Sequence, residues 1–390
     1  MKSNYRYIVK AFMAMAVIAG TTSCDDFLDR EPMSSISPET YYSTAAQLEA
    51  NLNDEYPNVL PSFGQWTYGI FGEDKGTDNQ IEVNANDRYT QDRWKVPHSE
   101  SDNWKFERIY RINFFLSEAL PKFGEDMSGS QNTISGSVAT IKHYIGEMYF
   151  LRAYEYFKKL QLFGDFPIIN QPLADEMEAL REASKRFPRN EVARFIISDL
   201  DKAYAYMSDV DMATTRINKD VAMLVKSRVA LFEATWLQNF KGTAFVPGGE
   251  GWPGASLHNN YQYPSGNIDN EVKYFLEQAV EASKLVADKY KGSLTENTGV
   301  LQQSADDPSN PYFDMFAQED LSDVKEVLLW RQYARGLSTH NINAAAGRGN
   351  YRIGLTRGFV QNFLMKDGTP VYAHGSYADG DGYYMGDKTV

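Results

Sequence analysis

Three of the six tryptophans lie in stretches without a helical pattern, beside carboxylate, amide and guanidinium side chains. Trp66 and Trp94 belong to region 58–102, and Trp252 belongs to region 241–268, which contains Gly and Pro. A sugar presents polarised C–H groups beside hydroxyl groups, so a sugar site combines an aromatic face with hydrogen-bonding side chains. Long loops in a compact domain usually carry function. The sequence therefore predicts these ligand-binding residues: Trp66, Asp78, Asn79, Arg88, Tyr89, Trp94 and Trp252.

Residue patterns typical of catalysis or of metal binding are weak. His143 and Glu147 are four residues apart on an expected helix, a spacing that can chelate a metal, but no third ligand is nearby, and we interpret them as a surface pair. The run from Asp379 to Gly382 begins like a calcium loop, but Val390 stands at the twelfth position, where an EF-hand needs Glu. A glycosidase carboxylate pair can be neither found nor excluded among 52 acidic residues. The sequence favours a binding protein without cofactor or metal over an enzyme.

The only cysteine, Cys24, stands where a bacterial lipoprotein is acylated. Residues 1–23 contain basic residues, then an apolar run from Ala11 to Gly20, then small polar residues, which is the layout of a signal peptide. That run is about half the length that a membrane-spanning helix needs. We expect removal of 1–23, lipid on Cys24 and an acidic tether over 24–36, ahead of a domain over 37–390. A secreted protein with a free thiol is the alternative.

Charge and cysteine content exclude several other classes of protein. The net charge is −13, and a phosphate-backbone partner requires clustered Lys and Arg, so we expect no nucleic-acid ligand. A single cysteine excludes an internal disulfide, a thiolate zinc site and an iron–sulfur cluster. The chain has 390 residues and is 43% hydrophobic, which is enough for a large core.

Apolar residues recur with helical spacing over most of the chain. The expected helices cover 44–55, 103–120, 138–163, 190–207, 219–240 and 270–290. Thr44 and Gln47 have capping-box spacing, and the segment 138–163 is apolar on two faces, which is typical of a central helix. Fragments of that segment match the tetratricopeptide consensus, although the full register fails. We expect a mostly α protein: stacked helix hairpins of tetratricopeptide-like type, with long binding loops and minor β-structure.

The stretch from Ile145 to Ile169 resembles the hallmark helix and exit turn of the SusD/RagB family, surface glycan-binding lipoproteins of the Bacteroidota. Four other segments keep the order of that family: 23–29 resembles its lipidated tether, 216–236 its second hallmark helix, 326–333 its returning strand and 354–368 its GLT-to-DG segment. Such proteins are typically longer, so we expect that a C-terminal part is missing from this chain.

The resemblance implies a function. It implies a non-catalytic lipoprotein, lipid-anchored on the outer membrane and facing outward, that binds oligosaccharides and delivers them to a SusC-like TonB-dependent transporter. A peptide-binding protein of the same architecture, as for RagB-like members, is the alternative. A helical-repeat scaffold that binds only protein and a lipid-anchored hydrolase are less favoured.

Several hallmark residues have structural explanations. Arg152 lies in an apolar helix and must find a partner, because an unpaired buried charge costs several kcal/mol; Glu155 or a backbone carbonyl at a neighbouring helix end is expected. Gly164 is expected to end the helix in the left-handed conformation, and Pro167 to keep the following chain extended. The other three tryptophans are expected in the core, two in helices and one in an apolar strand: Trp104, Trp236 and Trp330.

Overall fold

The computed structural model describes residues 41–64, 72–82, 103–124, 126–208, 212–300, 304, 306–334, 336, 339–340, 353–365 and 367–373. Its helices are α3 (Ala45–Val59), α4 (Glu107–Phe123), α5 (Val138–Phe163), α6 (Met177–Ala183), α7 (Arg189–Tyr206), α8 (Lys219–Asn239), α9 (Ile268–Tyr290), α10 (Pro311–Met315) and α12 (Arg357–Gln361). The 3-10 helices are η3 (Pro253–Ser256) and η4 (Val371–Ala373), and the strands are β1 (Gln80–Glu82) and β2 (Ile353–Leu355). The predicted mostly α architecture is confirmed.

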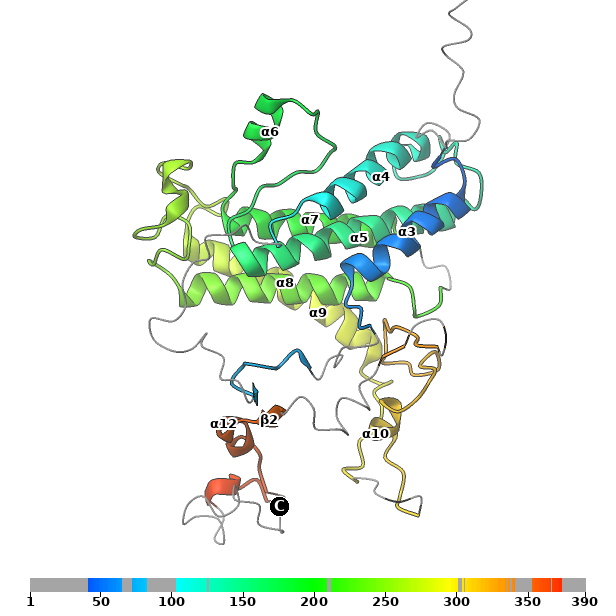
Figure 1. Cartoon of the computed structure of the whole chain (residues 1–390), viewed down its shortest axis with the longest axis vertical. Coiled ribbons are helices and arrows are strands. Elements are labelled where there is room, and N and C mark those ends of the chain that lie inside the picture. Colours follow the sequence, from blue (N-terminus) through cyan, green and yellow to red (C-terminus); the bar gives the residue numbers. More distant parts are fainter. Residues whose placement is uncertain are drawn as a thin grey trace, which may run out of the picture.

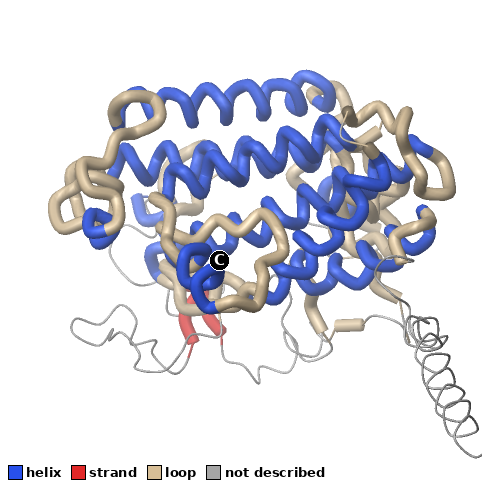
Figure 2. Tube along the Cα trace, turned by 90° about the horizontal axis from the view of Figure 1, so that it is seen from above, coloured by secondary structure: helices blue, strands red, loops and turns tan. Residues whose placement is uncertain are grey.

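The long helices lie side by side in one bundle, which positions everything else (Figure 1). Helix α6 stands on one edge of this bundle, whereas α10, β2 and α12 hang on the opposite side. Seen from above, the long helices form parallel rows, with loops gathered at their ends (Figure 2). Within the described residues, no helix is long and apolar enough to cross a membrane.

Local signals explain where the helices begin and end. The side chain of Thr44 accepts from the backbone N–H of Gln47 while the Gln47 side chain accepts from the Thr44 backbone, so the predicted capping box is present. Helix α5 begins after Ser137, whose hydroxyl accepts from the N–H of Thr140, and ends at Gly164. The backbone of Gly164 has a φ of +67°, a value that residues other than glycine rarely adopt. These capping residues explain why the predicted bounds of α5 agree with the structure.

Helix α5 is the central helix of the bundle. It packs against α3, α4 and α7, and α8 in turn packs against α7 and α9. Buried residues occur around most of its circumference, including Ile145, Phe150, Tyr156 and Leu160. A helix that is apolar on two faces must have neighbours on both. The prediction of a central helix over 138–163 is therefore confirmed.

The central helix carries a buried arginine, and its partner differs from the expected one. The guanidinium of Arg152 donates two hydrogen bonds to the carboxylate of Asp199 on α7, at 2.6 and 2.8 Å. It also donates to the side chain of Asn113 on α4, at 2.9 Å, and to the backbone carbonyl of Asn170, at 3.1 Å. Of the two expected partners, Glu155 is wrong, because it contacts Lys158 and Lys159 instead. Arg152 thus joins α5 to both neighbouring helices.

Two further buried ion pairs join the later helices. Arg189, at the start of α7, binds Glu233 of α8 through both carboxylate oxygens, with distances of 2.9 to 3.1 Å. Arg194, one turn later, binds Glu271 of α9 at 2.7 and 2.9 Å. The Arg189 guanidinium also lies 4.1 Å from the ring centroid of Trp236, a cation–π contact. Arg189 therefore ties α7 to α8, and Arg194 ties α7 to α9.

The predicted strand over 326–333 is wrong, because the structure has turns and extended chain there. Trp330 is anchored to the loop before α8 instead: its backbone N–H donates to the carbonyl of Thr214 at 3.1 Å and its indole N–H to the hydroxyl of the same residue at 2.8 Å. The backbone carbonyl of Leu328 accepts from the Asn218 side chain at 2.9 Å. The segment 326–333 is thus held by a few hydrogen bonds to the loop before α8, and not by the regular backbone pairing of a strand.

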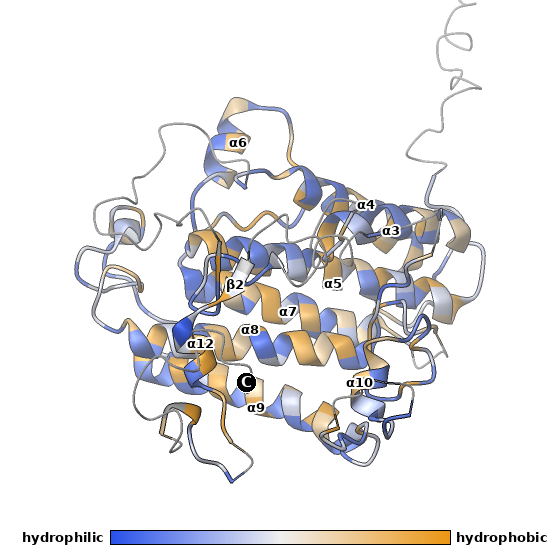
Figure 3. Ribbon diagram, turned by 60° about the horizontal axis from the view of Figure 1, so that its bottom comes forward, coloured by the Kyte–Doolittle hydropathy of each residue, from blue (hydrophilic) through white to orange (hydrophobic). Residues whose placement is uncertain are grey.

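Helices α8 and α9 leave an apolar groove on their outer face. The exposed side chains of Leu224, Leu231, Leu276 and Val280 line it, and its volume is about 1080 Å³. Hydrophobic and hydrophilic residues alternate along both helices there (Figure 3). Residues 326–329 also contribute to the lining, so one stretch of the later chain already lies along this face.

Candidate functional site

The two short strands bring the predicted binding loop against a late segment of the chain. Strands β1 and β2 pair antiparallel, with Gln80 opposite Leu355 and Glu82 opposite Ile353. The pairing continues by one residue, because the N–H of Thr356 donates to the carbonyl of Asn79 at 2.9 Å. The Thr356 hydroxyl also donates to the carbonyl of Asp78. The backbone of this loop is therefore fixed by the segment that resembles the GLT motif.

Within the loop, one predicted site residue uses its side chain locally and the other does not. The Asn79 amide donates to the carboxylate of Asp74 at 3.4 Å, and the Asn79 N–H donates to the hydroxyl of Thr77 at 3.1 Å. Asp78 is exposed, and its carboxylate has no hydrogen-bond partner among the residues that the structure describes. This carboxylate sits on a fixed backbone and is accessible to a ligand.

Four predicted site residues lie outside the described residues: Trp66, Arg88, Tyr89 and Trp94.

Trp252 lies inside its loop. Its side chain is only 5% exposed, and its indole N–H donates to the carboxylate of Asp165 at 2.8 Å. One face of the indole stacks on His258, with ring centroids 5.9 Å apart. The pKa of Asp165 is raised, because the effect of burial exceeds that of the hydrogen bonds from Trp252 and from the N–H of Arg189, which lower it. Trp252 was expected to offer an aromatic face to a ligand, but here it anchors its own loop to the end of α5.

A second set of contacts fixes the same loop to the helix starts. The hydroxyl of Tyr261 donates to the side-chain oxygen of Asn190 at 3.1 Å. Glu271 accepts from Asn190 at 3.1 Å, from Arg194, and from the N–H of Ser265 at 3.1 Å. Burial alone would raise the pKa of Glu271, but the hydrogen bonds from Arg194, Ser265 and Asn190 bring it below its usual value. The region 241–268 is therefore held rigidly by buried polar groups.

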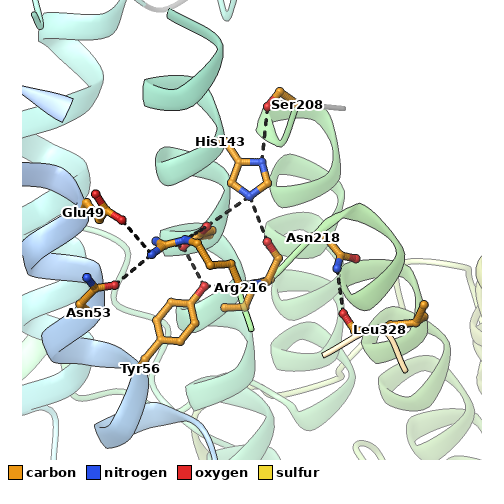
Figure 4. Close-up of polar contacts among 10 residues, drawn as sticks. Glu49, Asn53, Tyr56, His143, Ser208, Arg216, Asn218 and Leu328 are labelled. Carbon is orange, nitrogen blue, oxygen red and sulfur yellow. Dashed lines mark hydrogen bonds and ion pairs between the residues drawn. The ribbon is translucent and has the colours of Figure 1, made fainter. Parts of the chain in front are cut away.

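The predicted surface pair of His143 and Glu147 is wrong, because both side chains are buried. They are 1% and 0% exposed, respectively. The His143 Nε2 atom lies 3.0 Å from the carbonyl of Ile217 and 3.2 Å from Glu147 Oε1 (Figure 4). Two acceptors at one ring nitrogen require that Nε2 carries the proton.

Glu147 is the centre of a network that joins three parts of the bundle. It accepts two hydrogen bonds from Arg216, at 3.0 and 2.7 Å, and one from the Tyr56 hydroxyl at 2.8 Å. Arg216 reaches on to Asn53 of α3 at 2.9 Å (Figure 4). Burial and the neighbouring Glu147 charge raise the pKa of Tyr56. Every polar group here has a protein partner, so the network holds α3 on the bundle.

Metal chemistry finds no support in this part of the chain. Among the described residues, no group of three or more His, Cys, Asp or Glu side chains could hold a metal ion. The i, i+4 spacing of His143 and Glu147 is real, but its ligand atoms are already bound to Arg216, Tyr56 and Ile217. The exposed carboxylate of Asp78 therefore remains the polar group that a ligand could contact.

Sequence comparison places most of this architecture in a known family. The family model described as "Starch-binding associating with outer membrane" (SusD-like) matches residues 26–231. SusD-like protein P2 of Formosa agariphila is 25% identical over 253 residues, which are 62% of this chain and 46% of that protein. SusD-like protein P25 of the same organism is 25% identical over 233 residues, or 55% and 41% of the two chains. The chain thus spans about half the length of these curated relatives.

Structural comparison leads to the same fold. A SusD-like carbohydrate binding protein from Bacteroides fragilis superposes with a TM-score of 0.53 at 15% identity. The superposition covers 87% of this chain and 57% of that one. The sequence match over residues 26–231 and the shared helical fold lead to one conclusion: this chain belongs to the SusD-like family.

Proposed function

We propose that the protein is a non-catalytic oligosaccharide-binding lipoprotein of the outer cell surface, which passes its cargo to a SusC-like TonB-dependent transporter. Membership of a family described as starch-binding and associated with the outer membrane supports this proposal. The solved relative from Bacteroides fragilis is described as carbohydrate binding. Cys24, acylated after removal of residues 1–23, would be the anchor.

One structural observation carries the binding part of the proposal. The loop that presents Asp78 is held by contacts among Asp74, Thr77 and Asn79. Its backbone is also bonded to Thr356 at two carbonyls. A carboxylate without a partner can accept a hydrogen bond from a sugar hydroxyl. Because the backbone that carries it is already fixed, little conformational entropy is lost on binding. We assign Asn79 the role of holding this loop through Asp74, and Asp78 the role of the ligand contact.

The aromatic part of the surface is assigned from the sequence. Trp66 and Trp94 would supply stacking faces, with Arg88 and Tyr89 as hydrogen-bond donors beside them. Trp252 has a different role in this proposal: it positions its loop through Asp165, so its effect on the ligand is indirect.

The test is calorimetry on the mature domain with the glycan that binds best on a glycan array. Replacing Trp66 or Trp94 by Ala should weaken binding about 5- to 150-fold, which corresponds to about 1–3 kcal/mol for loss of one large apolar contact. The matched control is Tyr110→Ala, which removes an exposed aromatic side chain from helix α4. Binding of peptides with no binding of any glycan would contradict the proposal and favour a peptide carrier.

Anchor and partner have separate tests. Cys24→Ala should release the protein from whole cells in soluble form, whereas the wild-type protein should be membrane-bound and accessible to added protease. A detergent extract of wild-type cells should yield the protein together with a TonB-dependent β-barrel. Intact mass without acyl chains would contradict the anchor, and repeated purification without a barrel would contradict the partner.

A further inference from the structure

A hollow lies between α12, the short helix that follows strand β2, and the turn after that helix. Gly358, Gln361 and Asn362 line one side, Leu364 and Pro370 line the other, and the volume is about 550 Å³. The turn is closed by hydrogen bonds between Met365 and Thr369, at 2.8 Å, and between Val371 and Phe363, at 3.3 Å. The walls of the hollow are therefore fixed by backbone contacts.

The chemistry of the hollow fits an uncharged, hydroxylated ligand. Among the described residues, its lining combines two side-chain amides with apolar side chains and contains no charged residue. Neither the Gln361 nor the Asn362 amide has a hydrogen-bond partner among the described residues, although Gln361 is half-buried. An amide offers both a donor and an acceptor, as a sugar hydroxyl requires, and Leu364 and Pro370 offer apolar surface to C–H groups.

One residue connects the hollow to the Asp78 loop. The Thr356 hydroxyl accepts from the N–H of Phe359 at 3.1 Å and thereby caps α12, which carries Gly358 and Gln361. The N–H of the same Thr356 donates to the carbonyl of Asn79 at 2.9 Å. Thr356 consequently joins the helix that lines the hollow to the loop that carries the exposed carboxylate.

We propose that this hollow is a subsite for a neutral sugar residue of the bound oligosaccharide, with the amides of Gln361 and Asn362 as its hydrogen-bond partners. This inference rests on the proposed function, because it extends the same ligand surface. It specifies the ligand class further: an uncharged oligosaccharide of at least two residues, one at Asp78 and one in the hollow.

Gly358 allows a test that removes no polar group. A Cβ atom built on Gly358 meets no other atom within 4 Å, so a side chain there would extend into open space. Gly358→Leu should fill the hollow and leave the fold intact, because leucine is a better helix former than glycine. Gly292, just after α9, has the same open surroundings, so Gly292→Leu is the matched control.

The experiment is calorimetric titration of the mature wild-type domain and its variants with maltoheptaose, and with the best neutral glycan from the array. Gly358→Leu should weaken binding at least tenfold, Gln361→Ala with Asn362→Ala about tenfold, and Gly292→Leu not at all, with all thermal midpoints unchanged or raised. If Gly358→Leu melts early, the double alanine variant decides.

The outcomes separate the two proposals. Wild-type binding together with unchanged affinity in both hollow variants would overturn the subsite and leave the proposed function intact. Absence of binding to every glycan by the wild-type domain would overturn both. Tighter binding of acidic than of neutral oligosaccharides would also contradict the subsite, since the described part of its lining carries no positive charge.

Discussion

Buried polar side chains pair across the helix bundle, whereas the ribbon surface, by which we mean residues 72–82 with 353–373, leaves some polar side chains without a partner among the described residues. In the bundle, Arg152, Glu233 and Glu271 are buried and bound to specific partners on neighbouring helices. In the ribbon surface, Asp78, Gln361 and Asn362 have no side-chain partner among the described residues, while their backbones are fixed. This difference separates two kinds of polar side chain. A side chain that stabilises the fold is hydrogen-bonded to another part of the protein, whereas a side chain available to a ligand has no such partner. Four predictions test that distinction.

The largest effect is expected at Arg152. Arg152→Met leaves the buried carboxylate of Asp199 with only the partly exposed Lys202, 3.9 Å away, as a cationic neighbour. This should cost about 3–5 kcal/mol of the free energy of unfolding in urea. The double variant Arg152→Met with Asp199→Leu should recover most of that loss, because no unpaired charge remains. If Arg152→Met alone is as stable as the wild type, the hydrogen bonds of Arg152 do not stabilise the bundle.

Trp252 should behave as a bundle residue, although it lies in a loop. Trp252→Ala should lower the free energy of unfolding by about 3 kcal/mol, since it removes a buried ring and its hydrogen bond to Asp165. Glycan affinity of the fraction that remains folded should change less than for Trp66→Ala. Normal stability with abolished binding would make Trp252 a ligand contact, as the sequence predicts.

Glu271 should make the bundle sensitive to acid. Its folded-state pKa is below its unfolded value, so its contribution is present above the unfolded pKa and is lost as the pH falls through the folded pKa. The wild type should therefore lose more unfolding free energy between about pH 6 and pH 3 than Glu271→Gln, which costs about 2 kcal/mol at neutral pH. Parallel pH profiles for the two proteins would contradict the assignment.

The smallest effect on stability is expected in the ribbon surface. Asp78→Ala should change the free energy of unfolding by no more than about 0.5 kcal/mol, because its carboxylate is exposed and unpaired. Its affinity for glycan should nevertheless fall about tenfold, the scale of one hydrogen bond to a charged group. A large loss of stability would show that this carboxylate supports the fold.

The sequence predicts the bundle well because local residues determine its helices. Helix α5 has the bounds 138–163 in both prediction and structure, since Ser137 and Gly164 are the signals at its two ends. The order of helices follows from the same kind of evidence. Capping and periodicity act over a few residues and can therefore be read directly from the chain.

The side-chain partners could not be predicted, because they come from distant parts of the chain. His143 and Glu147 look like a surface pair until Tyr56 and Arg216, 91 and 69 residues from Glu147, cover them. Trp252 looks like a free aromatic residue until Asp165, 87 residues away, is placed beside it. Spacing along one helix gives no information about what packs against that helix.

The ribbon surface was predicted in part. Asp78 is predicted to contact ligand from its loop context, and this stays a prediction. Its side chain is exposed, and the bond from Thr356 that fixes its backbone has no local signal in the sequence. Gln361 and Asn362 carry no aromatic or charged group that would mark them as a sugar site. Gln361 and Asn362 line a hollow because the turn after α12 folds Pro370 back toward that helix.

The pairing of β1 with β2 has a consequence for the order of folding. Its hydrogen bond between Thr356 and Asp78 closes a loop of 278 residues, whereas helix pairs such as α4 with α5 close over much shorter stretches. Contacts of high sequence separation form late, because their loop entropy must be paid first. We therefore expect the bundle to form before the ribbon, so that helical content during folding follows the bundle and not the pairing of β1 with β2. A newly made molecule would then pass through a state in which the bundle is folded and the Asp78 loop is not yet fixed by Thr356.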